Sequence, residues 1–204
     1  MAARELGLFP LGTVLVPGEL MPLHVFEERY KDLVADCLEH EQPFGLVYAD
    51  EDGAREVGTR AKVVHVLERF DDGRLNVVVA GGERFRVSAL TRGRSFITAE
   101  VDPLEDEPAT PSPEDAERAL AAFRRLADTV EAQPQEPDPT SPELSFELAA
   151  RVELPTSPKQ DLLELRNEPA RLRLVAKLLE DARQVVIMQQ RLAENASHNG
   201  TRLG

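Results

Sequence analysis

Residues 8–30, LFPLGTVLVPGELMPLHVFEERY, decide how the chain begins to fold. Glycine and proline divide this stretch into short apolar pieces, because glycine adopts backbone angles that other residues avoid and proline presets a bend. The expected extended pieces are 6–8, 14–16 and 20–25. From Phe26 onward the apolar residues recur every three or four positions, which places them on one face of a helix. The stretch therefore predicts short strands that lead into a helix ending near His40.

Strand patterns and turn signals then alternate as far as residue 101. The expected strands are 44–49, 57–70, 75–80, 84–89 and 95–101, with turns at 50–55, at 71–73 and at Gly81-Gly82. Within the strand 57–70, the alternation predicts Ala61, Val63, His65 and Leu67 on one face and Lys62, Val64, Val66 and Glu68 on the other. Many short strands with one helix among them indicate an α+β fold whose first part, residues 1–103, is an antiparallel sheet curled on itself or a small barrel.

The second half of the chain is predicted to be helical. An acidic, proline-containing linker at 104–111 marks a domain boundary, and residues 112–194 form a helical bundle. Ser112-Pro113 followed by Asp115 is a typical helix start. Further helices are expected at 142–152, at 158–166 and from Asn167 onward. The proline-rich segment 133–142 is expected to be an exposed, mobile loop, and the polar end, 195–204, is expected to fray.

Composition limits the classes of function. The 204 residues include 37 acidic and 24 basic ones, a formal net charge of −13 that is spread evenly along the chain. Because neutralisation of phosphates supplies most non-specific affinity for nucleic acids, this balance argues against a nucleic-acid partner. Cys37 is the only cysteine and lies on the apolar face of the first helix, so a buried, unreactive thiol is expected. No signal peptide or membrane-spanning run is evident, and a soluble cytoplasmic protein is expected.

Five segments in order resemble the N-terminal, substrate-binding domain of Lon proteases. They are FPLGTVLVPGELMPLHVFEERYKDLV (9–34), PFGLV (43–47), VGT (57–59), DGRLNVVV (72–79) and GERFRV (82–87). The resemblance covers about residues 5–102, and a weaker helical resemblance continues to about residue 190. It implies a PUA-like β-fold for the first part. It also implies a module that recognises damaged or unfolded polypeptides and supports oligomer assembly.

No catalytic motif accompanies this resemblance. The GxxxxGK[ST] loop of an ATPase is missing, and Gly81-Gly82 is explained as a hairpin turn. The lysines, Lys31, Lys62, Lys159 and Lys177, are all expected to be solvated, which leaves no lysine for a peptidase dyad. The histidines, His24, His40, His65 and His198, show no metal-ligand spacing. We therefore expect a stand-alone, non-catalytic form of the domain without cofactor or metal.

The expected ligand is an unfolded or partly hydrophobic polypeptide segment, bound in an apolar groove between the two parts or along a sheet edge. The candidate partner-binding residues are Glu27, Glu28, Arg29, Tyr30, Tyr48 and Phe70. The aromatic members of this set are the ones least securely assigned to the core. A protease or chaperone acting in trans and a homo-oligomer are further expected partners. The alternatives are an adaptor for one specific folded protein and an RNA-binding PUA-like protein, whose basic patch would comprise Arg69, Arg74, Arg84, Arg86, Arg92 and Arg94.

Overall fold

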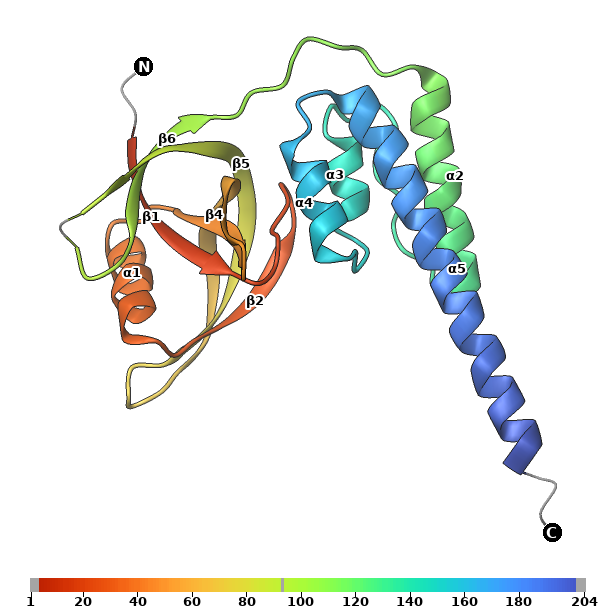
Figure 1. The fold of residues 1–204 in the computed structure, drawn as a ribbon, viewed down its shortest axis with the longest axis horizontal. Helices are drawn as coiled ribbons and strands as arrows, with labels where there is room; N and C mark the ends of the chain where they lie inside the picture. The colour runs from red at the N-terminus through yellow and green to blue at the C-terminus, as the bar shows by residue number, and fades with distance from the viewer. Residues whose placement is uncertain (1–3, 93, 201–204) are drawn as a thin grey trace. The chain divides into compact units, whose positions relative to one another are not determined.

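The computed structural model describes residues 4–92 and 94–200, and of residues 194–200 it describes the backbone only. The elements, in chain order, are β1 Arg4–Leu11, β2 Leu20–Val25, α1 Glu28–Glu39, β3 Phe44–Asp50, β4 Gly53–Arg69, β5 Leu75–Thr91, β6 Thr98–Pro103, α2 Pro113–Thr129, α3 Leu144–Ala149, α4 Thr156–Glu164 and α5 Glu168–Gly200 (Figure 1). They form two compact units. Unit 1 comprises residues 1–107 and 149–166, and unit 2 comprises residues 108–148 and 167–204. The fold class is α+β, as expected.

The six strands of unit 1 form one mixed sheet in the order β2-β5-β4-β3-β1-β6. The expectation of a wholly antiparallel sheet is wrong, because β1 and β3 pair in parallel, from Leu8 opposite Gly45 to Leu11 opposite Tyr48. The connection between these two strands contains β2 and α1, and a crossover of that length allows the second strand to enter the sheet in the same direction as the first. The second half of β5 also pairs with β6, so the ladder β1–β3–β4–β5–β6 returns to β1.

β5 runs without a break through Gly81-Gly82, where the sequence predicted a turn. Gly81, unlike Gly82, is needed for the close approach of another segment rather than for a bend. A Cβ atom at Gly81 would lie 2.2 Å from the carbonyl oxygen of Val16, whereas one at Gly82 would meet its nearest atom, the carbonyl oxygen of Arg60, at 3.4 Å. The turn that follows Val16 is bonded to this point, since Gly18 N–H donates to the Gly81 carbonyl and Gly81 N–H donates to the Glu19 carbonyl.

This difference between neighbouring glycines is testable by urea denaturation. Gly81→Ala is expected to lower the free energy of unfolding by about 1–3 kcal/mol, because backbone must move to admit the methyl group. Gly82→Ala is the matched control and is expected to change it by less than about 0.5 kcal/mol, as at most surface sites. Equal effects at the two positions would show that the approach of Val16 does not constrain Gly81.

The main core of unit 1 lies between α1 and the inner face of the sheet. Tyr30 and Leu33 of α1 pack there with Phe9, Phe44 and a set of valines. The rings of Phe9 and Tyr30 stack with centroids 4.0 Å apart, and burial raises the pKa of the Tyr30 hydroxyl. Cys37 is buried as predicted, and burial, reinforced by the neighbouring Asp36 carboxylate, raises the pKa of its thiol to about 11.

The segment Val14–Val16 is buried but is not a strand. Its backbone groups bond to side chains instead of to a neighbouring strand. The Thr59 hydroxyl donates to the Leu15 carbonyl, and Val16 N–H donates to Glu19 Oε2. The other Glu19 oxygen accepts from Lys159 Nζ at 2.7 Å. Lys159 is therefore buried in an ion pair, and the expectation that all four lysines are solvated is wrong.

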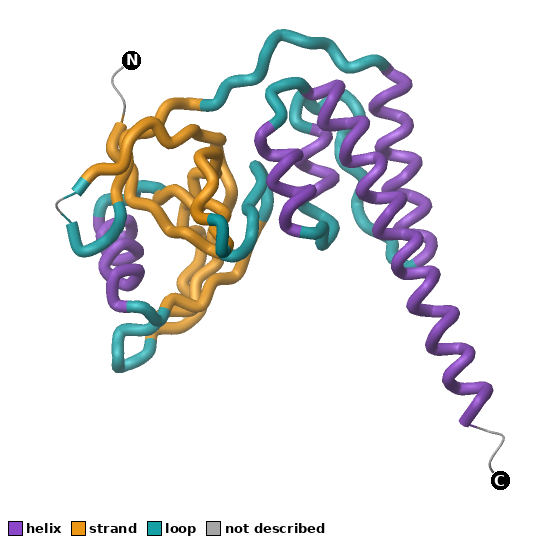
Figure 2. Tube along the Cα trace, in the orientation of Figure 1, coloured by secondary structure: helices purple, strands orange, loops and turns teal. Residues whose placement is uncertain are grey.

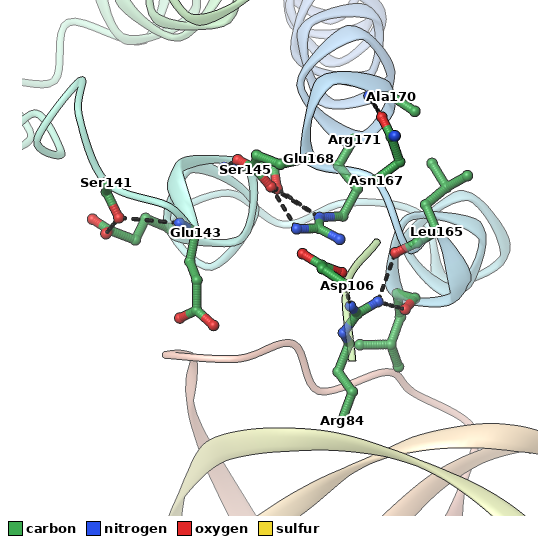
Figure 3. A network of polar contacts seen from close by, with 12 residues as sticks. Arg84, Asp106, Ser141, Glu143, Ser145, Leu165, Asn167, Glu168, Ala170 and Arg171 are labelled. Carbon is green, nitrogen blue, oxygen red and sulfur yellow. Dashed lines mark hydrogen bonds and ion pairs between the residues drawn. The ribbon is translucent and has the colours of Figure 1, made fainter. Parts of the chain in front are cut away.

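Helix α4 belongs to unit 1, although the sequence grouped residues 112–194 in a single bundle. Its anchor is Arg84 of β5, a buried side chain whose guanidinium donates to the carbonyls of Leu163 and Leu165 and pairs with Asp106 (Figure 3). The α4 side chain Gln160 also donates to the Val57 carbonyl.

Helix α4 begins at Thr156, two residues before the expected Pro158, and has no side-chain cap. Whether the β-rich and helical parts fold independently stays a prediction.

Unit 2 consists of helices and loops (Figure 2). The expected start of α2 is confirmed, because Ser112 Oγ accepts from Asp115 N–H. α2 runs parallel to α5, since Asp115 pairs with Arg173 and, farther along both helices, Arg125 pairs with Glu180. The α5 backbone is helical to Gly200, where fraying was expected from residue 195, and residues 201–204 lie outside the described part.

A buried charged network joins α3 to the first turn of α5 within unit 2. Glu168 accepts from both the backbone N–H and the hydroxyl of Ser145, at 2.9 and 2.6 Å. Arg171, with 0% of its surface exposed, donates to Glu168 at 2.6 Å (Figure 3). It also lies 4.4 Å from the ring centre of Phe146.

The 133–142 loop, expected to be mobile, is attached to unit 2. Glu136 accepts two hydrogen bonds from Arg124 of α2, and Pro137 is buried.

Candidate functional site

The outer face of β2, β5 and β4 exposes a surface that is mostly uncharged. Strand pairing arranges it in three rows of residues that face away from the core. The rows are Leu20–Ala80–Lys62, Pro22–Val78–His65 and His24–Asn76–Glu68. The intervening residues, such as Val77 and Val79, are buried on the inner face. We call these three rows the outer surface.

Two irregularities in β4 bring additional apolar side chains into solvent. The pairing of β4 with β5 shifts between Val63 and His65 and again between Val66 and Glu68, which leaves Val64 and Leu67 as the extra residues. A β-bulge of this kind breaks the alternation of side chains between the two faces. Leu67 is consequently 63% exposed, and Val64 is also exposed. The predicted faces of this strand are therefore wrong beyond Val63: Val66 packs inward, and His65 faces out.

The third row is linked by side-chain hydrogen bonds across all three strands. Asn76 Nδ2 donates to Glu68 Oε2 at 2.9 Å, so the amide oxygen of Asn76 faces His24 Nδ1, 2.6 Å away. The His24 ring nitrogen therefore donates. This row is the polar border of the outer surface. Among residues 4–92, no side-chain hydrogen bonds link the residues of the other two rows.

Aromatic side chains extend the outer surface beyond its polar row. The rings of His24 and Phe26 stack at 5.7 Å, and the Phe70 ring meets His24 edge-on at 6.2 Å. Phe26 is 59% exposed. Arg74 lies over Phe70, and Lys31 donates to the Asp72 carbonyl, which attaches the β4–β5 turn to α1. The result is a rigid aromatic edge that offers ring faces to an incoming side chain.

The structure separates the predicted partner-binding residues into three groups. Phe70 lies at the aromatic edge, and Glu28 is close to it through its ion pair with Lys31. Glu27 and Arg29 pair with each other at the start of α1, where Arg29 lies over the ring of Tyr30. Tyr30 is a core residue, which corrects the expectation that its packing is insecure.

Tyr48 is half-buried near the end of β3, where its hydroxyl bonds to Asp50. That bond raises the pKa of Tyr48 and lowers the pKa of Asp50. A binding role for the predicted set stays a prediction.

The arginines proposed for RNA do not form one patch. Arg84 is buried and holds α4, whereas Arg74 lies over Phe70. Arg86 pairs with Glu56 on the opposing strand. Only Arg92 and Arg94, with Arg29 of α1, share a hollow.

The sequence patterns do not identify Leu20, Phe26, Val64 and Leu67 as surface residues. They place Phe26 on the apolar face of a helix and Leu67 on the apolar face of a strand, and such faces are normally buried. Only the bulges and the start of α1 at Glu28 place them outside the core.

In the described part of the chain, none of the helices is long and apolar enough to cross a bilayer. Residues 4–92 and 94–193 also contain no group of three or more histidine, cysteine or acidic side chains placed to hold a metal ion. The side chain of His198 lies outside the described residues.

Comparison with known proteins identifies the class. The family model described as the ATP-dependent protease La (LON) substrate-binding domain matches residues 5–181. Lon protease 2 of Myxococcus xanthus is 29% identical over 207 residues, which cover 93% of this chain and 25% of that protein. Lon protease of Escherichia coli K12 is 26% identical over 211 residues, 92% of this chain and 26% of that protein.

Solved structures agree in fold. The Lon N-terminal domain protein from Xanthomonas campestris has a TM-score of 0.65 and 28% identity, covering 83% of this chain and 95% of that one. The N-terminal domain of Mycobacterium avium complex Lon protease has a TM-score of 0.65 at 20% identity, covering 87% of this chain and 99% of that one. The fold and the mixed sheet thus define an α+β domain of the Lon N-terminal type. The chain belongs to the Lon substrate-binding domain family, and it spans about a quarter of the length of the Lon proteases that it matches.

Proposed function

We propose that this chain is a non-catalytic recognition module that binds unfolded or partly hydrophobic polypeptide segments on the outer surface. The observation that carries the proposal is the exposure of Leu20, Phe26 and Leu67 around one mostly uncharged sheet face in a substrate-binding domain. Exposed apolar residues that gather in one place, rather than singly, are typical of interaction sites. The predicted groove between the β-rich and helical parts stays an alternative location.

The form of the outer surface suits an extended segment of low sequence specificity. Its three rows cross β2, β5 and β4, so an extended segment that lies diagonally across the face would meet Leu20, Val78 and Leu67 in succession. The free edge of β2 is a poor template for an added strand, because Pro22 at its centre has no N–H to donate. Binding by side chains on the face is therefore favoured over extension of the sheet.

The proposal is tested by fluorescence anisotropy of a labelled, permanently unfolded polypeptide. Leu67→Glu is expected to weaken its binding at least about fivefold, or roughly 1 kcal/mol, because a carboxylate replaces an apolar contact. Binding to the wild-type chain is expected to persist at high salt, since apolar burial is not screened.

Leu192→Glu is the matched control, because Leu192 is a leucine of similar exposure, 58%, on α5 of unit 2. It is expected to leave binding unchanged within twofold. Equal loss in the two variants, or no binding by the wild-type chain at micromolar concentrations, would exclude the outer surface as the binding site.

The proposed module has no chemistry of its own and requires a partner to act on what it binds. We propose a protease or chaperone that works in trans, or a homo-oligomer that multiplies weak sites. Broad specificity and weak binding are expected together, because an interaction that accepts many apolar segments cannot depend on hydrogen bonds to particular side chains.

A further inference from the structure

A hollow of about 500 Å³ lies between the first turn of α1 and the connection from β5 to β6. The charged residues that line it are all arginines: Arg29, Arg92 and Arg94. Leu90, Phe96 and Ile97 contribute apolar surface, and Leu90 is 70% exposed. We call this site the arginine hollow. It stands out in a chain whose formal net charge is −13.

Two of the three guanidinium groups are held in place on aromatic rings. Arg29 lies 4.5 Å from the ring centre of Tyr30, and Arg94 lies 5.4 Å from that of Phe96. Both rings are themselves buried. Stacking of this kind fixes the plane of a guanidinium and leaves its N–H edge available for a carboxylate.

The same two arginines keep donors for a ligand. Arg29 uses Nε and Nη2 on a single oxygen of Glu27, and Arg94 uses Nη1 on Asp36. A guanidinium has five N–H donors, so each retains at least two without a partner among the described residues. Exposed ion pairs of this type contribute little to stability, but they orient the side chain.

Arg92 is exposed and forms no ion pair or hydrogen bond within the part of the chain that the structure describes. It therefore supplies a positive charge that no carboxylate among the described residues pairs with. Next to it, Leu90 and Ile97 offer aliphatic contacts. A ligand complementary to both features carries a carboxylate beside an apolar side chain.

We propose that the arginine hollow binds acidic–aliphatic stretches of the polypeptides that this module recognises. The inference rests on the proposed function and adds a substrate class to it: segments in which Asp or Glu adjoins Leu, Ile or Val. A peptide is favoured over a nucleic acid for two reasons. The hollow is large enough for a few side chains only, and the acidic surroundings repel a long polyanion.

The test uses the full chain and three fluorescent probes in an anisotropy titration. The first probe is an unstructured peptide with alternating Glu and Leu, and the second has the same sequence with every Glu replaced by Gln. The third is a permanently unfolded polypeptide, as used for the outer surface, of neutral and apolar composition. Arg92→Glu is expected to weaken binding of the first probe at least tenfold and to leave the other two within twofold.

Arg86→Glu is the matched control, because Arg86 is a similarly exposed arginine of β5 outside the hollow. It is expected to change none of the three affinities by more than twofold. Added salt should weaken the Glu–Leu probe and not the apolar polypeptide.

Two groups of results would overturn the inference. The hollow is excluded as a binding site if the Glu and Gln probes bind equally, or if Arg92→Glu leaves binding of the Glu probe intact. In either case the proposed function still holds if binding of the apolar polypeptide depends on Leu67. Failure of all three probes removes both proposals. A separate titration with labelled single-stranded RNA tests the remaining alternative: Arg92-dependent binding of RNA in place of the Glu–Leu probe would reassign the hollow to a polyanion.

Discussion

Replacement of Arg171 by methionine is expected to lower the free energy of unfolding of unit 2 by about 3–5 kcal/mol. The methionine fills the space but leaves the buried Glu168 carboxylate without the guanidinium that donates to it at 2.6 and 3.0 Å. Loss of one partner from a buried ion pair costs this much because the remaining charge stays out of water. Urea denaturation followed by far-UV circular dichroism measures it, since unit 2 contains most of the helix.

Two further variants separate the buried charge from other causes. Arg173→Met, two residues along α5, removes an exposed pair with Asp115 and is expected to cost less than about 1 kcal/mol. The double variant Glu168→Gln/Arg171→Met is expected to recover stability relative to Arg171→Met, because neither charge is then left unpaired. A double variant less stable than Arg171→Met would show that the network acts through shape rather than charge.

Replacement of Arg84 by methionine is expected to cost unit 1 about 3 kcal/mol and to loosen α4. Arg84 donates at 2.7 Å to the Leu163 carbonyl and at 2.6 Å to the Leu165 carbonyl, and no methionine atom can replace these bonds. Each buried carbonyl that loses its donor contributes roughly 1–3 kcal/mol. The tyrosine bands of near-UV circular dichroism report on unit 1 selectively, because the chain has no tryptophan and both tyrosines, Tyr30 and Tyr48, belong to this unit.

Hydrogen exchange distinguishes local loss of α4 from global unfolding. In the Arg84→Met variant, amides of residues 159–164 are expected to exchange faster than those of β5, because the helix loses its anchor while the sheet keeps its ladder. Arg86 is on the same strand as Arg84, and Arg86→Met, which removes an exposed pair with Glu56 of β4, should leave both sets unchanged. Unchanged exchange in α4 of Arg84→Met would show that other contacts suffice to hold it.

Local sequence patterns predicted most helices and strands but not the two faces of β4. Ser112-Pro113 and Asn167 fix helix starts through hydrogen bonds within one turn, so they are readable from neighbouring residues. The positions of Val64 and Leu67 depend on how β4 pairs with β5, and each bulge reverses the alternation that follows it. The candidate site was therefore the part that sequence periodicity described least well.

The arginine hollow shows the same dependence on tertiary structure. Arg29 and Arg92 are 63 positions apart in the chain, and the sequence assigned them to two different hypotheses, a protein contact and an RNA patch. They meet because β1 pairs with β6 and α1 packs against the inner sheet. No spacing rule predicts such a meeting, since it depends on strand pairing between distant segments.

The sequence by itself determined the α+β class, the family, the capped helices and the burial of Cys37, since each depends on local pattern or on motifs in order. Tertiary structure decided three other features. A crossover of sufficient length made β1 and β3 parallel, and the approach of Val16 required Gly81 inside a strand. The third is the assignment of α4 to unit 1 through the buried Arg84. All three depend on contacts between residues far apart in the chain, for which the local sequence carries no signal.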